Sequence, residues 1–334
     1  MKKILSLVLI ALILCVAVLG CTSEKNASPP ASKEKEFKKF AIGSGSAGGG
    51  FFMGASALSS LINSVAKDRF EAVVEVTNAS ANNAELIQSR ELELAMCSTD
   101  IAWEAYNGEN VFKDFKCDKL RTVYPGWSGT YLFVTLDKNI NDITGFNGKA
   151  YSGGAAASAN AALTDRLFET FNVKANITHL PNADAARSLG DGTIKGFTTS
   201  YPSPQIQELE TTHDVKLIVL TDEQKAVIKE KYPQYIWTSV PAGLFKNQPN
   251  ELENIGLYNL FISSSDVSED FIYDICKIAY ENRDYLKTVH AQMAMDMDTA
   301  NLSKTTIPYH AGAVKYFREI GVNIPNELLP PEVK

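Results

Sequence analysis

The sequence predicts an α/β protein of two lobes, each a mainly parallel sheet flanked by helices, with a ligand cleft between the lobes. Strand-like apolar runs alternate with amphipathic stretches along most of the chain, which is the pattern of parallel strands connected by helices. The turns that end these strands are rich in glycine, serine and asparagine. In addition, 334 residues are more than one compact core usually holds, so two units are expected.

The start of the chain is not expected to belong to the fold. Lys2 and Lys3 precede an uncharged run over residues 4–20, which ends in Val18-Leu19-Gly20-Cys21. This arrangement is typical of a bacterial lipoprotein signal peptide, in which Cys21 becomes the lipidated first residue of the mature chain. An uncleaved anchor helix is the alternative, and both interpretations place the rest of the chain outside the cytoplasm.

A polar segment follows the lipidation site. Residues 22–36 contain Ser, Pro, Lys and Glu and no large apolar side chain, so we expect residues 21–36 to form a flexible tether. A lipid on Cys21 contributes about 0.8 kcal/mol per buried methylene group and would hold the protein on a bilayer. We therefore expect an exported protein that is lipid-anchored to the outer face of the cytoplasmic membrane, in the periplasm or at the cell surface.

The segment after the tether is expected to form three strand–turn–helix units of the first lobe. Its helices follow from apolar side chains at helical spacing, and its strands from β-branched or apolar runs. The expected elements are a strand at 37–42, a helix through 58–65, a strand at 71–77, a polar turn at 78–83 that opens a helix through 86–87, a strand at 92–97 and a helix capped by residues 98–100.

The second lobe is expected to be inserted into the first. Its elements are strands at 149–151, 177–180, 194–199 and 216–220, with helices at 158–171 and 204–212. Apolar strands at 130–136 and 256–262 are the expected crossings, and helices at 270–287 and from Pro308 to near Gly321 complete the first lobe. We therefore expect residues 37–134 and 254–334 to form lobe 1 and residues 135–253 to form lobe 2.

Composition narrows the class of protein further. Removal of residues 1–20 leaves 30 basic and 39 acidic side chains, a net charge of −9, which argues against nucleic-acid binding. Of the five cysteines, Cys97, Cys117 and Cys276 remain once the signal is cleaved and Cys21 is lipidated. Their spacing fits no zinc or redox motif, so we interpret them as small buried residues, with a Cys97–Cys117 disulfide as the alternative.

A glycine-rich turn, Gly43 to Gly50, follows the first expected strand. Its G-x-G-x-x-G spacing between a strand and a helix matches a dinucleotide site, with Glu75 on the next strand as a possible ribose partner. Soluble nicotinamide cofactor is not supplied outside the cytoplasm, so we expect no cofactor. The backbone N–H groups at the helix start still favour an anion, and Ser44 and Ser46 add hydroxyl donors. A purely structural tight turn is the alternative.

Three strand-to-helix turns of the first lobe, at residues 44–50, 78–83 and 98–100, share this small and polar character. In a parallel sheet such turns lie beyond the carboxyl ends of the strands, where ligands bind. Each turn alone could serve only to cap its helix. Three of them on one rim predict a binding site for an anionic group.

The sequence contains no recognisable catalytic or metal-binding motif. Neither G-x-S-x-G nor G-x-x-x-x-G-K-[ST] occurs, and the four histidines, at positions 179, 213, 290 and 310, lack metal-ligand spacing. Met293, Met295 and Met297 alternate, so a Cu(I) site is an alternative, although methionine more often fills irregular packing. We therefore expect a binding protein rather than an enzyme, with no metal site.

Four stretches in the same order resemble the TAXI-type solute receptors of TRAP transporters. Gly43 to Phe52, Ser98 to Gly108, Pro202 to Leu209 and Ile307 to Ala313 are similar to the family's G-T-G-S-T-G-G-T-Y-Y, Q-S-D-V-A-Y-E-A-Y-N-G, P-N-P-A-I-Q-E-L and P-L-H-P-G-A. The resemblance covers about residues 37–325. It implies a type II periplasmic-binding-protein fold, in which two hinged lobes close over a small carboxylate and deliver it to a membrane permease.

Carried over to the matching positions, the resemblance implies ligand contacts from both lobes. Aromatic side chains near the expected rim, including Phe52 and Tyr201, would pack on an apolar part of the solute. The expected ligand-binding residues are Ser44, Gly45, Ser46, Gly48, Gly49, Phe51, Ser80, Ser98, Asp100, Trp127, Tyr131, Ala155, Ser158, Thr199 and Ser200.

One stretch departs from the family. Where relatives read G-S-G-T followed by a polar or basic residue, this chain has alanine at 155, 156, 157 and 159, with Ser158 between them and no arginine to pair with a carboxylate. We therefore expect a small organic anion, a carboxylate with an apolar part, that is delivered to a TRAP-type permease. A ligand-sensing subunit of a signalling system with the same fold is the alternative, and an exported enzyme is a weaker one.

Overall fold

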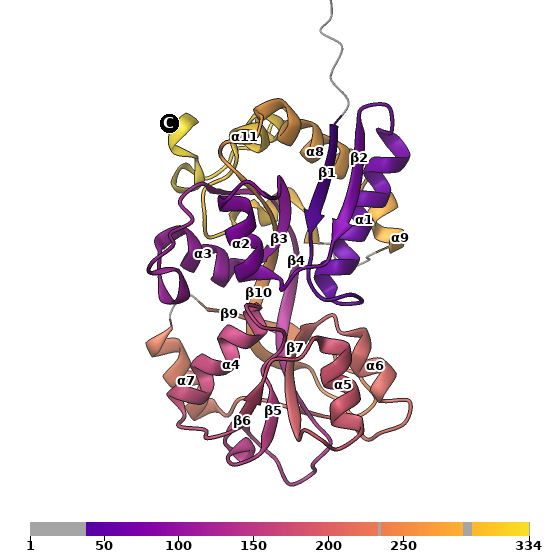
Figure 1. The fold of residues 1–334 in the computed structure, drawn as a ribbon, viewed down its shortest axis with the longest axis vertical. Coiled ribbons are helices and arrows are strands. Elements are labelled where there is room, and N and C mark those ends of the chain that lie inside the picture. The colour runs from indigo at the N-terminus through magenta and orange to yellow at the C-terminus, as the bar shows by residue number, and fades with distance from the viewer. Residues whose placement is uncertain (1–37, 233–234, 290–295, 334) are drawn as a thin grey trace, which may run out of the picture. The chain divides into compact units, whose positions relative to one another are not determined.

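The computed structural model describes residues 38–232, 235–289 and 296–333. Within these residues, ten strands form one sheet in the order β2-β1-β3-β10-β4-β7-β5-β6, with β8 paired to β4 and β9 paired to β10 (Figure 1). The strands are β1 (Lys38–Gly43), β2 (Phe70–Glu75), β3 (Leu94–Ser98), β4 (Leu120–Thr135), β5 (Ala150–Ser152), β6 (Asn176–Thr178), β7 (Gly196–Tyr201), β8 (Lys216–Ile218), β9 (Ile236–Val240) and β10 (Leu252–Ser264).

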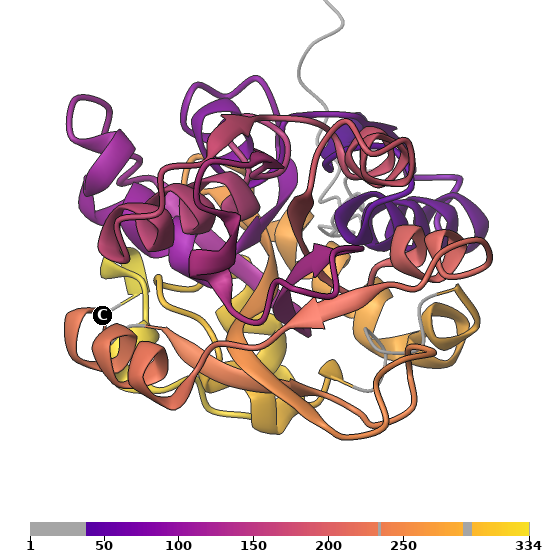
Figure 2. The ribbon, with the colours of Figure 1, turned by 90° about the horizontal axis from the view of Figure 1, so that it is seen from below.

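Helices connect the parallel strands and cover the sheet. The helices are α1 (Gly50–Val65), α2 (Ser80–Gln88), α3 (Thr99–Asn107), α4 (Ala159–Thr170), α5 (Asn182–Gly190), α6 (Pro204–Leu209), α7 (Asp222–Lys231), α8 (Glu269–Glu281), α9 (Arg283–Val289) and α11 (Ala311–Glu319). We call β1 to β3 with α1 to α3, α8, α9 and α11 lobe 1, and β5 to β8 with α4 to α7 lobe 2. In lobe 2, α4 and α7 lie on one side of the strands and α5 and α6 on the other (Figures 1 and 2).

The strand directions bring the two lobes together at the carboxyl ends of their parallel strands. β1 is parallel to β2 and β3, β10 is antiparallel to both β3 and β4, and β7 is antiparallel to β4 but parallel to β5. The parallel strands of lobe 2 therefore run opposite to those of lobe 1. Because the carboxyl ends of both sets point to the junction of the lobes, the turns that open their helices face each other there.

Two long strands carry the chain between the lobes. β4 has 16 residues and β10 has 13, and they pair antiparallel from Thr130 with Gly256 to Leu120 with Ser264. In lobe 2 the same β4 pairs with β7 and β8. The crossings expected at 130–136 and 256–262 overlap these strands, and the lobe boundaries that the sequence predicts fall inside them.

Aromatic side chains dominate the core of lobe 1. Phe40 of β1 packs edge to face against Phe271 of α8 and Phe70 of β2, with ring centroids 4.9 and 6.3 Å apart. All three side chains are buried. These contacts hold the helix α8, which comes late in the sequence, against the first strands of the chain, and they explain why both ends of the described chain belong to one lobe.

The two-lobed α/β architecture confirms the predicted fold class. The details differ where tertiary contacts override local patterns. β4 begins at Leu120, ten residues before the expected strand, because its first half pairs with β10. The expected turn at 78–83 ends at Ala79, and Ser80 already belongs to α2. The single helix expected at 270–287 is two helices, α8 and α9, which are separated at Asn282 with φ −122°.

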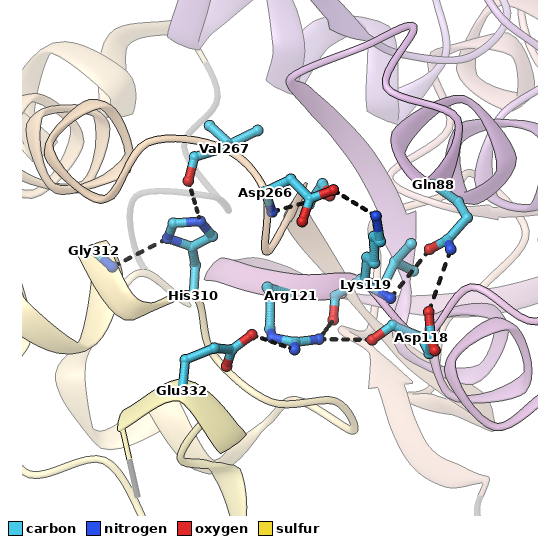
Figure 3. A network of polar contacts seen from close by, with 11 residues as sticks. Gln88, Asp118, Lys119, Arg121, Asp266, Val267, His310, Gly312 and Glu332 are labelled. Carbon is cyan, nitrogen blue, oxygen red and sulfur yellow. Dashed lines mark hydrogen bonds and ion pairs between the residues drawn. The ribbon is translucent and has the colours of Figure 1, made fainter.

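A polar network fixes the C-terminal segment to the start of β4 (Figure 3). The buried guanidinium of Arg121 donates to the carbonyls of Asp118 and Leu120 and forms an ion pair with Glu332 at 2.6 Å. Nearby, His310 caps α11: its Nδ1 accepts from the N–H of Gly312 at 3.1 Å, and its Nε2 lies 3.1 Å from the carbonyl oxygen of Val267. His310 is therefore a structural residue.

The structure also bears on the expectations about cysteines, membrane spans and metal sites. Cys97, Cys117 and Cys276 are buried free thiols, so the alternative of a Cys97–Cys117 disulfide is wrong. Among the residues the structure describes, no helix is long and apolar enough to cross a bilayer, and no group of three or more His, Cys, Asp or Glu is placed to hold a metal ion. Met297 is buried in the core. Cys21, Phe37, His290, Met293 and Met295 lie outside the described residues.

Candidate functional site

A cavity with a volume of about 70 Å³ lies where the two lobes meet. That volume has room for only a handful of water-sized groups, since one water needs about 10–15 Å³ by this measure. The cavity is lined by small, polar and aromatic residues from both lobes and from the long strands: Gly45, Ser46, Gly49, Gly50, Phe51, Ala79, Ser80, Ser98, Trp127, Ala155, Ser158, Ala159, Asn160, Asn182, Ser200, Tyr201, Pro202, Leu257 and Asn259.

Helix starts from both lobes converge on this cavity. The wall includes the residues that open α1, α2 and α3 in lobe 1 and α4 and α5 in lobe 2. No side chain caps the N-termini of α1, α2, α3 or α5, whereas Ser158 caps α4 by accepting from the N–H of Ala161 at 3.2 Å. The first turn of a helix carries unpaired N–H groups and a partial positive charge, so these ends create a positive potential in the cavity.

None of the described residues that line the cavity carries a charged side chain. Its polar groups are the hydroxyls of serine and Tyr201 and the amides of asparagine. Burial, together with the nearby Asp296, raises the pKa of Tyr201, so its phenol stays protonated and able to donate. The site therefore offers donors and helix dipoles to an anion, without a fixed cation.

Two serines of lobe 1 form a paired donor group. The Oγ of Ser80 accepts from the N–H of Ser98 at 3.1 Å, and the two hydroxyls lie 3.2 Å apart. Only one hydroxyl proton is needed for the bond between them, so the other can be donated to a ligand in the cavity.

The floor of the cavity is aromatic. Trp127 of β4 is 1% exposed and lies against α1. This contact requires a glycine, because a Cβ atom on Gly54 would lie 2.4 Å from the indole Cη2. The amide of Asn259 on β10 donates to the carbonyl of Trp127 at 3.2 Å and joins the floor to the neighbouring strand.

The alanine-rich turn of lobe 2 forms part of the opposite wall. Ala155 lines the cavity, while Ala156 and Ala157 are exposed. Ala157 has φ 58°, a left-handed conformation that favours glycine, and its carbonyl accepts from the N–H of Ala81 at the start of α2, 3.0 Å away. The turn therefore reaches across the cleft and satisfies a backbone donor of lobe 1.

A second contact across the cleft confirms that the lobes are closed in this structure. Gln205 of α6 donates from Nε2 to the carbonyl of Gly48 at 2.8 Å. Gly48 itself has φ 73°, which only glycine adopts readily. Both contacts use backbone atoms of the turns that were expected to bind the ligand.

The structure places most of the predicted site residues in the wall of the cavity. Those that line it are Gly45, Ser46, Gly49, Phe51, Ser80, Ser98, Trp127, Ala155, Ser158 and Ser200. Those that do not line it are Ser44, Gly48, Asp100, Tyr131 and Thr199.

Ser44 and Asp100, two of the polar residues outside the wall, bond to partners within the protein, whereas the buried hydroxyl of Thr199 has no hydrogen-bond partner among the described residues. Ser44 donates to the carbonyl of Glu75 at 2.7 Å. Asp100 accepts from the hydroxyl of Tyr131 at 2.9 Å and from the N–H of Ile101 at 2.9 Å, so this pair lies in the interior of the protein. Thr199 is fully buried beside Ser200, and neighbouring side chains of a strand point to opposite faces.

Sequence reasoning missed several residues of the wall, above all Asn160, Asn182 and Asn259. Asn182 begins α5, a helix that the sequence pattern did not predict. Asp184 in the first turn of this helix is a helix-start signal that could have indicated it. Asn259 is a polar residue inside an apolar run, and that interruption was the available indication of a cavity.

Comparison with solved structures supports the fold. A structure from work on glutathione import by GshT and the cystine ABC importer TcyBC of Streptococcus mutans matches with a TM-score of 0.50 and 13% identity, over 78% of this chain and 95% of that one. A putative L-cystine ABC transporter protein from Listeria monocytogenes matches with a TM-score of 0.48 and 11% identity, over 78% of this chain and 98% of that one. A TRAP periplasmic solute-binding protein from Sulfitobacter, with bound β-D-galacturonate, matches with a TM-score of 0.47 and 10% identity, over 84% of this chain and 91% of that one. At these identities the likeness concerns the fold alone, which is the type II periplasmic-binding-protein fold.

The family is shown by the sequence itself. A family model described as the NMT1-like family matches residues 42–321, from the end of β1 to the residue that follows α11 and Ile320. This match includes every residue that lines the cavity. The chain therefore belongs to the NMT1-like family.

Proposed function

We propose that this protein is the extracytoplasmic solute receptor of a TRAP-type transporter of the TAXI class, and that it captures a small organic anion and delivers it to a membrane permease. The observation that carries the proposal is the cavity between the lobes, where uncapped helix starts converge and no charged side chain is present among the described lining residues. A positive potential without a cation favours a small anion over a neutral or cationic solute.

One carboxylate suits the lobe 1 side of the cavity. Ser46, Ser80 and Ser98 provide hydroxyls beside the starts of α1, α2 and α3. A hydrogen bond to a charged group is worth about 1.5–3 kcal/mol, and a helix end adds roughly 0.3–2 kcal/mol. Three or four such interactions reach the approximately 8 kcal/mol that micromolar affinity requires.

Part of the remaining wall is apolar and suits a short apolar group. Phe51, Trp127, Ala155, Ala159 and Leu257 present carbon atoms to it. A second carboxylate placed against these carbon atoms would lose its hydration without gaining a hydrogen-bond donor from them, which costs several kcal/mol. The small volume and this apolar side support a monocarboxylate about the size of pyruvate or 2-oxobutyrate.

The serines of the cavity wall have no general base among the described lining residues, which favours binding over catalysis. A nucleophilic serine needs a general base within hydrogen-bond reach. The described residues that line the cavity include no His, Asp, Glu or Lys, and Asp100 is engaged by Tyr131 behind the wall. The serines therefore suit ligand contact better than bond cleavage.

The membrane partner and the anchor are supported by the sequence. The expected lipidation at Cys21 and the tether over 21–36 would keep the receptor near a permease. The order of the four TAXI-like stretches supports a TRAP-type permease. A sensor subunit would use the same cavity, and a membrane kinase gene in place of a permease gene beside this one would favour it.

The test of the proposed function is ligand binding. Native mass spectrometry of the freshly purified protein should show a co-purified anion. Isothermal titration calorimetry with pyruvate, 2-oxobutyrate, succinate, 2-oxoglutarate and the neutral propionamide should show tighter binding of the monocarboxylates than of the dicarboxylates, and no binding of the amide. Equal affinity for propionamide and the acids would contradict the anion assignment.

A further inference from the structure

A buried charged cluster joins the two lobes outside the cavity. Arg166 on α4 of lobe 2 forms an ion pair with Glu104 on α3 of lobe 1, and the same guanidinium donates to the hydroxyl of Tyr235, just before β9. None of these three residues lines the cavity. Glu104 and Arg166 are 62 positions apart in the sequence, and only the packing of the lobes brings them together.

The cluster is shielded from water. The side chain of Glu104 is 2% exposed and that of Arg166 is 11% exposed. The guanidinium carbon of Arg166 also lies 5.5 and 5.6 Å from the ring centroids of Tyr232 and Tyr235, within cation–π range. The arginine is therefore held by a carboxylate, a phenol and two aromatic rings at once.

Burial makes this pair sensitive to the loss of either partner. Burial raises the pKa of Glu104 even though Arg166 acts in the opposite direction, so the ionised carboxylate depends on its partner. For Arg166, burial alone would lower the pKa, but Tyr235 and Glu104 outweigh it and the net direction is upward. Removal of one partner of a buried pair leaves an uncompensated charge, whereas replacement of both by apolar side chains is often neutral.

Opening of the cleft would separate this pair. Glu104 would move with α3 and Arg166 with α4, and both charges would regain water. The closed state therefore contains a directional contact that the open state lacks, and a contact of that kind biases the equilibrium between the two states. It acts beside the contacts of Ala157 with Ala81 and of Gln205 with Gly48, which also join the two lobes.

We propose that Glu104, Arg166 and Tyr235 form a latch that holds the lobes closed and thereby sets solute affinity without touching the solute. These are positioning residues: they determine the fraction of molecules in which both walls of the cavity can contact the solute. The inference rests on the closure that the proposed function requires, but it does not depend on which solute is bound.

The latch can be tested in the intact chain without solute. Spin labels on Lys113→Cys in lobe 1 and Glu169→Cys in lobe 2 would report the distance between the lobes by double electron–electron resonance. Both positions are exposed, and the native Cys97, Cys117 and Cys276 are buried, so labelling would be selective in a chain whose Cys15 and Cys21 are replaced by serine. The labelled protein should populate the short distance of this structure and a longer one, and the ratio of the two measures closure.

The variants form a double-mutant cycle. Glu104→Met and Arg166→Met should each raise the open-to-closed ratio by about tenfold or more, because each leaves one buried charge without its counter-ion. The double variant should return the ratio to within about threefold of the native value. Tyr235→Phe removes only a hydroxyl and should give an intermediate shift in a protein that still folds.

A matched control lies within one lobe. Arg69 pairs with the largely buried Asp274 at 2.9 Å, and both residues belong to lobe 1. Arg69→Met should lower the melting temperature and leave the open-to-closed ratio unchanged. The latch is disproved if the short distance is absent from the native protein, if either single variant keeps the native ratio, or if the double variant opens by the sum of the two single effects.

Discussion

Trp127 of β4 packs directly on Gly54 of α1, so closely that a Cβ atom on Gly54 would lie 2.4 Å from the indole Cη2 and 2.5 Å from Cζ3. Real carbon atoms do not approach to that distance without a shift of one partner. The indole is 1% exposed and forms the floor of the cavity. The helix and the binding site are therefore coupled at this contact.

We predict that Gly54→Ala weakens both the fold and the site. Alanine gains about 1 kcal/mol of helix propensity over glycine, but overpacking a tight contact costs about 1–3 kcal/mol, so a net loss of up to about 2 kcal/mol is expected. The displaced indole should narrow the cavity and lower affinity for pyruvate by roughly tenfold. Urea unfolding and calorimetry measure the two effects.

The control for this change is Ser60→Ala, on the exposed face of the same helix. It should leave affinity unchanged. Unaltered stability and affinity in Gly54→Ala would show that the indole moves aside freely and that the contact does not couple helix and site.

We predict that the alanine turn restricts the solute to one carboxylate. Replacement of Ala155-Ala156-Ala157 by Gly-Ser-Gly adds a hydroxyl donor, and its glycines let an anion approach the backbone of the turn more closely, so binding should shift toward 2-oxoglutarate and away from 2-oxobutyrate. An unpaired buried polar group costs about 1–3 kcal/mol, so the shift in relative affinity should be roughly tenfold.

Ala157→Gly alone separates the effect of backbone strain on stability from the effect of the turn on ligand preference. Ala157 has φ 58°, where a non-glycine residue costs roughly 1–2 kcal/mol, so this single change should stabilise the protein without a change in acid preference. Identical affinities of the native and triple variants for every acid would mean that the turn does not contact the solute.

We predict that Cys21 carries the anchor. Cys21→Ser should release the protein from the membrane fraction or leave the signal uncleaved, because serine has no thiol for the lipid. Fractionation and intact-mass measurement report both outcomes. Cys15→Ser, within the expected signal peptide, is the control and should be retained normally. Normal cleavage and retention of Cys21→Ser would contradict a lipid anchor.

We predict that the low pKa of His310 makes the folded protein less stable in mild acid. Burial lowers the pKa of His310 to about 4, with Arg121 acting in the same direction and Glu332 against it. The unfolded chain takes up this proton near pH 6.5, so the free energy of unfolding falls as the pH drops from about 6.5 to about 4. The full effect is on the order of 3 kcal/mol, measured by urea unfolding across this range.

His310→Asn is the matched variant, because asparagine can still cap α11 but does not titrate. Its unfolding free energy should depend less on pH between 6.5 and 4 than that of the native protein. Parallel pH curves for the two proteins would show that His310 does not carry this effect.

The sequence alone determined the fold class and much of the first-lobe wall. A strand, a glycine-rich turn and a helix at 38–65 follow from periodicity and turn chemistry over a few residues, and the same reasoning predicted Ser80 and Ser98 at later turns. These features are local, so short-range sterics and hydrogen bonding specify them.

Only the tertiary structure decided which polar groups face the solute. Asp100 looked like a site residue but bonds Tyr131 in the interior, while Asn182 and Asn259 reach the cavity from distant elements. The pair of Glu104 and Arg166 shows the same principle, because the sequence around either residue gives no indication of its partner. Such juxtapositions depend on the opposed strand directions of the two lobes, and buried polar groups take whichever partners that packing supplies.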